Sequence, residues 1–164
     1  MSTERETATW LSQDAHDRLQ AELNELIAAR PAVAAEINAR REEGDLRENG
    51  GYHAAREEQS KQEGRILYLK EFLRNAEVGD APTADKVAPG TVVTIYFDDD
   101  QSDTETFLLG SREISATTDL TVYSPESALG KAILGSRPGQ TVTYTAPSGA
   151  DIKVTVVKFA PFGA

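Results

Sequence analysis

The feature that most constrains the fold of this chain is a heptad pattern that occupies two stretches of residues 11–76. In each stretch, the positions that would face a partner helix recur at alternating spacings of three and four residues, which is typical of a coiled coil. The pair Gly44 and Asp45 separates the stretches, so the pattern predicts an antiparallel helical hairpin. Its seam consists of His16, Leu19, Leu23, Leu26, Arg30, Val33 and Ile37 in the first arm, and Tyr52, Ala55, Gln59, Gln62, Ile66, Leu69, Leu73 and Ala76 in the second.

The seam also predicts where the hairpin folds back. When Leu19 is paired with Leu73, and the other seam residues follow in order, the midpoint of the pairs falls at Leu46. Arms of about 30 residues would extend roughly 40–50 Å at the rise of an α-helix. Pro31 removes one backbone hydrogen bond from the first arm and predicts a kink there. The middle of the seam is poor in apolar side chains, which suits a long projection better than a compact core.

The second half of the chain has a different period. Apolar and polar residues alternate in several short runs after residue 90, which predicts about five β-strands. One helix interrupts them, with Ser124 as its N-cap, Pro125 in its first position and Gly135 as its stop. The predicted class is α+β with two domains. The predicted parts are a coiled-coil hairpin over residues 1–78, a linker over 79–89, and a globular domain with an antiparallel sheet and one helix over 90–164.

Composition excludes several classes of function. The formal net charge of −10 argues against free double-stranded DNA or an anionic membrane as the main partner. A single Trp and 7% aromatic residues offer little surface for stacking single-stranded nucleic acid. The absence of cysteine excludes disulfides and thiolate zinc sites. The N-terminal residues have no secretory pattern, and no apolar run approaches membrane-spanning length, so a cytoplasmic protein is expected.

The acidic residues at the break allow two interpretations. In the first they are helix punctuation: Gly44 ends one helix, Asp45 caps the next, and Glu48 completes a capping box. In the second, Asp45 and Glu48 are exposed oxygen ligands for Mg²⁺, a cation that commonly takes one or two protein carboxylates together with water and phosphate. Such a pair would bind weakly alone, so another molecule would have to complete the site.

Four segments carry a resemblance to a known family: "EEGDLRENGGYHAAREEQ" from Glu42, "LQAELNEL", "RPAVAAEI" and "SPESALGKAILG". In their order along the chain, these segments resemble the bacterial Gre transcript cleavage factors over nearly the whole chain. The net charge is more similar to the acidic branch of that family than to the basic one. The resemblance implies an N-terminal coiled-coil hairpin and a C-terminal domain of FKBP-like fold. It further implies that the globular domain docks on RNA polymerase while the hairpin enters the secondary channel.

The resemblance also assigns roles to residues. It implies that Asp45 and Glu48 help to hold a second Mg²⁺ in the polymerase active site, so that the polymerase cleaves its own backtracked transcript. The chain would then be no enzyme itself, would bind no cofactor stably, and would act as a monomer with the nascent RNA 3′ end near its tip. Other candidate residues have structural alternatives, namely a solvated helix surface or a capped helix. They are Arg40, Arg41, Arg47 and Arg56 for the transcript or polymerase channel, and Ser124 and Pro125 for polymerase docking.

Three other functions compete with cleavage stimulation. A Gre-like protein could occupy the channel and inhibit, and the acids Glu42 and Glu43 beside Asp45 keep this alternative open. A coiled-coil chaperone or adaptor would have no polymerase contact. An FKBP-like fold suggests prolyl isomerase activity, but the aromatic residues of the second half do not form a convincing proline pocket in sequence.

Overall fold

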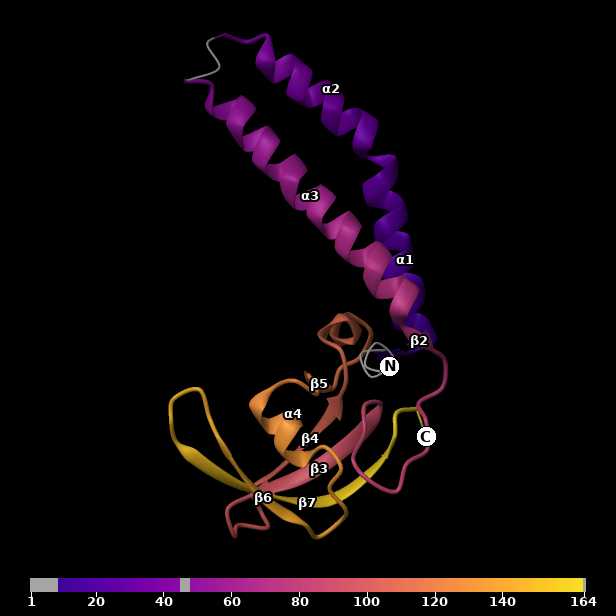
Figure 1. Cartoon of the computed structure of the whole chain (residues 1–164), viewed down its shortest axis with the longest axis vertical. Helices are drawn as coiled ribbons and strands as arrows, with labels where there is room; N and C mark the ends of the chain where they lie inside the picture. The colour runs from indigo at the N-terminus through magenta and orange to yellow at the C-terminus, as the bar shows by residue number, and fades with distance from the viewer. Residues whose placement is uncertain (1–8, 45–47, 164) are drawn as a thin grey trace, which may run out of the picture. The chain divides into compact units, whose positions relative to one another are not determined.

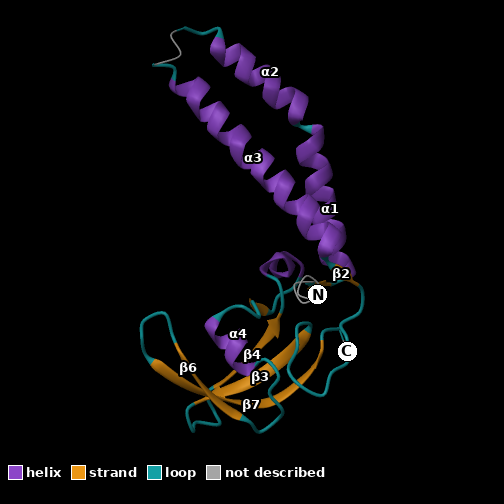
Figure 2. Ribbon diagram, in the orientation of Figure 1, coloured by secondary structure: helices purple, strands orange, loops and turns teal. Residues whose placement is uncertain are grey.

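A computed structural model describes residues 9–44 and 48–163 of the chain (Figure 1). The chain divides into two compact units. One unit is Asp17–Asn75, and the other combines the chain up to His16 with the chain from Ala76 onward. The first is helical and the second is built on a β-sheet, which confirms the two-domain α+β class (Figure 2).

The helical unit is the predicted antiparallel hairpin. Its first arm contains α1 (Gln13–Ala28) and α2 (Arg30–Arg41), and α3 (Gly50–Asn75) returns beside them (Figure 1). At 1.5 Å per residue, the 26 residues of α3 extend about 39 Å. The predicted seam is confirmed, because every seam residue except Arg30 is buried or half-buried. Its most deeply buried members are Leu19, Leu23, Ile37, Ile66 and Leu69.

The first arm is interrupted at the predicted proline. Pro31 lies in the first turn of α2, and because it has no N–H, the helical bond that would continue α1 is missing. Hydrogen bonding resumes at once, since the Val33 N–H donates to the Ala29 carbonyl at 3.0 Å. Beside the break, Arg30 leaves the seam and forms a bidentate ion pair with Glu63 across the arms, at 2.9 and 3.0 Å.

The second unit contains a five-stranded sheet in the order β5-β4-β3-β7-β6. Most neighbours are antiparallel, but β4 and β5 are parallel, so the prediction of a wholly antiparallel sheet is wrong at this edge. A 3₁₀ helix, η2 (Arg112–Thr117), provides the crossover that a parallel pair requires and a tight hairpin cannot supply. The strands are β3 (Thr91–Phe97), β4 (Thr104–Leu109), β5 (Thr121–Tyr123), β6 (Thr141–Thr145) and β7 (Asp151–Pro161).

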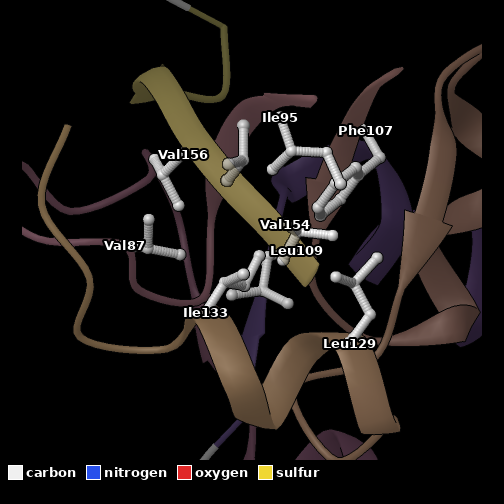
Figure 3. Packing of buried hydrophobic residues seen from close by; sticks show 9 residues of the cluster. Val87, Ile95, Phe107, Leu109, Leu129, Ile133, Val154 and Val156 are labelled. Carbon is white, nitrogen blue, oxygen red and sulfur yellow. The ribbon is translucent and has the colours of Figure 1, made fainter. Parts of the chain in front are cut away.

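One short helix, α4 (Ala128–Ile133), covers a face of this sheet (Figure 2). Leu129 and Ile133 of α4 pack with inward-facing residues of β3, β4 and β7 to form the core (Figure 3). Val87 joins the same core at 1% exposure, although the sequence prediction places it in the linker. Period-two patterning did not reveal Val87 because it lies outside any strand.

The start of α4 differs from the prediction. Its N-cap is Ser127, whose Oγ accepts from the Gly130 N–H at 3.1 Å, so the prediction of Ser124 as the cap is wrong. Ser124 instead caps the preceding turn by accepting from the Glu126 N–H at 3.0 Å. The two serines are joined, since the Ser127 hydroxyl donates to the Ser124 carbonyl at 2.6 Å. Pro125 therefore lies in this turn and not in the helix, whereas Gly135 (φ +81°) follows α4 as expected.

A small parallel sheet pairs β1 (Trp10–Leu11), which precedes α1, with β2 (Glu77–Val78), which follows α3. Trp10 secures it: its indole N–H donates to the Gly79 carbonyl at 3.1 Å, and its ring packs edge-on against Phe162 at 5.9 Å. Two-residue strands carry no periodic signal, so the sequence gives no indication of this pairing. Among the residues described, no helix is both long enough and apolar enough to cross a bilayer.

Candidate functional site: the acidic apex of the hairpin

The first arm ends earlier than the glycine predicts. Helix α2 stops at Arg41, and Glu42 follows as its C-cap in a helical conformation. Gly44 has a φ of +146°, a conformation that favours glycine, but it lies beyond this cap. Glu42 and Glu43 are exposed in the turn between the helix end and Gly44. The chain therefore turns over several residues here instead of closing at a single C′ glycine.

The second arm starts later than predicted. Helix α3 begins at Gly50, and Asn49 caps it: the Asn49 Oδ1 accepts from the Tyr52 N–H at 2.9 Å, and the Asn49 carbonyl accepts from the His53 N–H at 3.1 Å. Glu48 therefore precedes α3, so the interpretation in which it completes a capping box at the start of this helix is wrong. Asp45 and Arg47 themselves lie outside the described residues. Glu48 immediately precedes the cap, where its side chain has no part in starting the helix.

Glu48 consequently presents an exposed carboxylate. Its main chain has a local role, because its carbonyl accepts from the Gly50 N–H at 3.1 Å. Within residues 9–44 and 48–163, its side chain makes no hydrogen bond or ion pair. With respect to the described residues, the oxygens of Glu48 are therefore exposed and available to an incoming ligand.

The donor set at the apex suits a shared metal site and not an enclosed one. Across the described parts of the chain, no three His, Asp or Glu side chains are grouped so that they could hold a metal ion. Mg²⁺ does not need such a group, because it usually retains water and takes one or two carboxylates along with phosphate oxygens. Glu48 can supply one of these ligands, and Asp45 precedes it by three positions in the chain.

Two of the candidate arginines have partners within the hairpin. Arg40 is near two acids, with Nη atoms 3.8 Å from Glu36 and 3.7 Å from Glu43. The guanidinium of Arg41 is 5.8 Å from the ring centroid of Tyr52, a cross-arm cation–π contact. Both side chains remain exposed, so these contacts leave them accessible.

The remaining candidate residues stay predictions. Arg56 is exposed on α3 and donates from Nη1 to the Gln59 Oε1 at 3.4 Å. Ser124 and Pro125 are half-buried in the turn before α4, where Ser124 has the local capping role described above. They belong to a different unit from the apex. Within the hairpin, the structure brings together Arg40, Arg41 and Glu48.

Family models match both halves of the chain. The model described as transcription elongation factor, N-terminal, matches residues 9–78, and the model described as transcription elongation factor, GreA/GreB, C-term, matches residues 81–161. The chain belongs to the GreA/GreB family of transcription elongation factors. The resemblance seen in the sequence is thereby confirmed.

Relatives agree with this membership. Transcription elongation factor GreA of Mycolicibacterium smegmatis is 60% identical, and that of Mycobacteroides abscessus 58% identical, each over 94% of this chain and 95% of the relative. These relatives belong to the GreA branch, which the acidic composition predicts. A crystal structure of GreA factor homolog 1 from Thermus thermophilus is 23% identical and covers 93% of this chain and 99% of its own, with a TM-score of 0.42. At that score, the family assignment depends on the sequence matches alone.

Sequence reasoning missed one residue of the apex of this GreA/GreB family member, the cap Asn49. A signal existed, since Asn is among the best N-cap residues and Tyr52 follows at the N3 position. The competing pattern from Asp45 to Glu48 has the spacing of a capping box and lies nearer the Gly44 break. Gly50 and Gly51 also argue against starting a helix there, because glycine is a poor helix former in helix interiors.

Proposed function

We propose that this chain binds RNA polymerase, inserts the apex of its hairpin into the secondary channel, and stimulates the polymerase's own Mg²⁺-dependent cleavage of backtracked RNA. Membership of the GreA/GreB family supports the contact with polymerase. The hairpin supports the insertion, because α3 alone supplies about 39 Å of reach within a unit only two helices thick. Cleavage of this kind rescues elongation complexes that have arrested.

The observation that carries this proposal is the exposed carboxylate of Glu48 at the apex. Since Asn49 caps α3, Glu48 is not needed to satisfy the helix start, and nothing in the described part of the hairpin holds its side chain. A carboxylate with these properties contributes nothing evident to folding. Its placement at the fold-back of the arms is explained by a partner outside the chain.

The chemistry assigned to the apex is ligand donation. Hydrolysis of a phosphodiester with two metal ions requires cations that stabilise both the attacking and the leaving oxygen. Glu48 and Asp45 would supply carboxylate oxygens to the second Mg²⁺ and accept a hydrogen bond from the attacking water. The polymerase supplies the transcript and the rest of the metal shell. The chain forms no covalent bond to RNA and is an activator, not a hydrolase.

Other contacts follow from the same geometry. Arg47 and Arg56 would contact the transcript near its 3′ end or acids of the channel, together with the accessible parts of Arg40 and Arg41. Ser124 and Pro125 would dock on the polymerase surface, in a turn made rigid by the hydrogen bonds of the two serines. One copy of the chain is sufficient for this arrangement, so the factor acts as a monomer.

The test uses elongation complexes assembled in a backtracked position. The wild-type chain is expected to release short 3′ fragments and restore extension, whereas the double variant Asp45→Asn/Glu48→Gln should release none while still competing with the wild type for polymerase. Full cleavage by the double variant would contradict the role of the acids. Slower nucleotide addition without 3′ fragments would instead identify a channel-binding inhibitor.

A further inference from the structure

Asn49 contacts both arms of the hairpin. Its Oδ1 accepts from the Tyr52 N–H in the first turn of α3, and its Nδ2 donates to the carbonyl of Arg40 in the last turn of α2, nine residues earlier. The N–H groups at the start of a helix and the carbonyls at its end have no partners within the helix. One carboxamide therefore satisfies a free N–H of α3, bonds a carbonyl at the end of α2, and connects the two helices.

The orientation of this carboxamide is fixed by its partners. In the flipped orientation, the Oδ1 would face the Arg40 carbonyl oxygen and the Nδ2 would face the Tyr52 N–H, so both hydrogen bonds would be lost. Asn49 is also half-buried, whereas Glu48 and Gly50 on either side of it are exposed. The side chain is thus directed into the space between the arms, and the adjacent Glu48 side chain is directed to solvent.

A second contact between the arms supports the same region. A Cβ added at Gly51 would lie 3.3 Å from Nη1 and 3.4 Å from Cδ of Arg40, so the absence of a side chain at Gly51 lets Arg40 approach the first turn of α3. The Arg40 carbonyl additionally accepts from the Glu43 N–H at 3.2 Å. Arg40 therefore has a main-chain hydrogen bond, contacts with two acids and packing against Gly51. These contacts position the carbonyl to which Asn49 donates.

We propose that Asn49 is a positioning residue that holds Glu48 in the direction needed at the polymerase active site by joining the end of α2 to the start of α3. This inference rests on the proposed function. A misplacement of about 1 Å can cost roughly a hundredfold in rate when a group must meet reacting atoms. The nearest buried seam residue of the first arm is Ile37, three residues before Arg40. Beyond it, the hydrogen bond of Asn49 to Arg40 aligns the arms together with the cation–π contact of Arg41 with Tyr52.

Substitution of Asn49 by serine or aspartate separates its two roles, which are to cap α3 and to bond to the end of α2. Both cap a helix about as well as asparagine. Aspartate has no donor, and a serine hydroxyl ends one bond short of the position from which the Asn49 Nδ2 reaches the Arg40 carbonyl, so neither reproduces that hydrogen bond. We expect Asn49→Ser to unfold at the same thermal midpoint as the wild type. The concentration of factor that gives half-maximal stimulation should stay within about twofold of the wild-type value, whereas the maximal cleavage rate should fall about tenfold. Asn49→Asp should give the same loss. Asn38→Ser, which changes an exposed asparagine of α2, is the matched control and should behave as wild type.

A double variant tests whether Asn49 acts through Glu48. If it does, Asn49→Ser/Glu48→Gln should cleave no more slowly than Glu48→Gln alone, because the positioned group is already absent. A wild-type maximal rate in Asn49→Ser, or a double variant slowed by the full product of the single effects, would overturn the inference. A wild-type chain that fails to stimulate cleavage would contradict the proposed function itself, and the two failures are therefore distinguishable.

Discussion

At the scale of single residues, helix capping and a second role belong to two nearby residues, where the sequence alone suggests one residue for both. Asn49 caps α3, so Glu48 is available for a partner. Ser127 caps α4, so Ser124 can close the turn before it. In both places two cap-forming residues lie close together. Asn49 is favoured by a contact with the other arm, the Arg40 carbonyl, and Ser127 by the close approach of Gly130 to the Ser124 carbonyl, six residues earlier.

Gly130 permits a prediction at this scale. A Cβ at this position would lie 2.1 Å from the Ser124 carbonyl oxygen, which is backbone and cannot move aside without breaking the turn. Gly130→Ala is therefore expected to lower the free energy of unfolding of the sheet-containing unit by about 2–4 kcal/mol. Urea unfolding of that unit measures it. A loss below about 0.5 kcal/mol would show that the turn before α4 is easily displaced.

At the scale of elements, the helical hairpin could be predicted well and the sheet less completely. The heptad positions specify the seam because a buried helix face repeats at a fixed period, and Pro31 specifies the break because it lacks an N–H. Three other features depend on contacts between residues apart in the sequence, which no local period encodes. They are the parallel pairing of β5 with β4, the burial of Val87, and the hydrogen bond from Trp10 to Gly79. At the apex, sequence analysis identified Glu48 as a candidate but did not identify Asn49 as the residue that caps α3 in its place.

Gly64 gives a prediction for the second arm. It lies inside α3, and a Cβ added there would meet no atom within 4 Å. Because alanine is about 1 kcal/mol more favourable than glycine in a helix interior, Gly64→Ala should stabilise the hairpin by about 0.5–1 kcal/mol. Urea unfolding followed by circular dichroism at 222 nm measures this gain. A destabilised hairpin would mean that the face of α3 at residue 64 is occupied.

The ion pair of Glu22 with Arg65 predicts a pH dependence of the hairpin. Hydrogen bonds from the Arg65 guanidinium, at 2.7 and 2.9 Å, hold the pKa of Glu22 below its ordinary 4.5. Since the pKa is lower in the folded state, the stabilisation is present above pH 4.5 and is lost as the pH falls through the lowered value. Glu22→Gln should therefore cost about 0.5 kcal/mol at pH 7, because the pair is partly exposed, and nothing at pH 2. An equal cost at both pH values would contradict this account.

At the scale of the whole molecule, the two units carry different spectroscopic probes. The long helices α1, α2 and α3 dominate the signal at 222 nm, whereas the single tryptophan, Trp10, is 6% exposed in the sheet-containing unit. Each unit also has its own set of buried residues, the seam in one and the sheet core in the other. Unfolding of each unit can therefore be followed separately in the intact chain.

This separation predicts crossed effects of the two glycine variants. Gly130→Ala should shift the unfolding transition seen by Trp10 fluorescence and leave the transition at 222 nm nearly in place, and Gly64→Ala should do the reverse. Both probes are recorded on the same samples during urea unfolding. Equal shifts of both transitions in either variant would show that the chain unfolds as one cooperative unit.

The central claim is that the hairpin apex donates a Mg²⁺ ligand to the polymerase, and the Mg²⁺ dependence of stimulated cleavage tests it most directly. Backtracked complexes are titrated with Mg²⁺ in the presence of wild type, Glu48→Gln, or Glu57→Gln, which removes another exposed acid, on α3. Loss of one carboxylate ligand should raise the half-maximal Mg²⁺ concentration about tenfold or more for Glu48→Gln, with no change for Glu57→Gln. A wild-type Mg²⁺ dependence and rate for Glu48→Gln would contradict the claim.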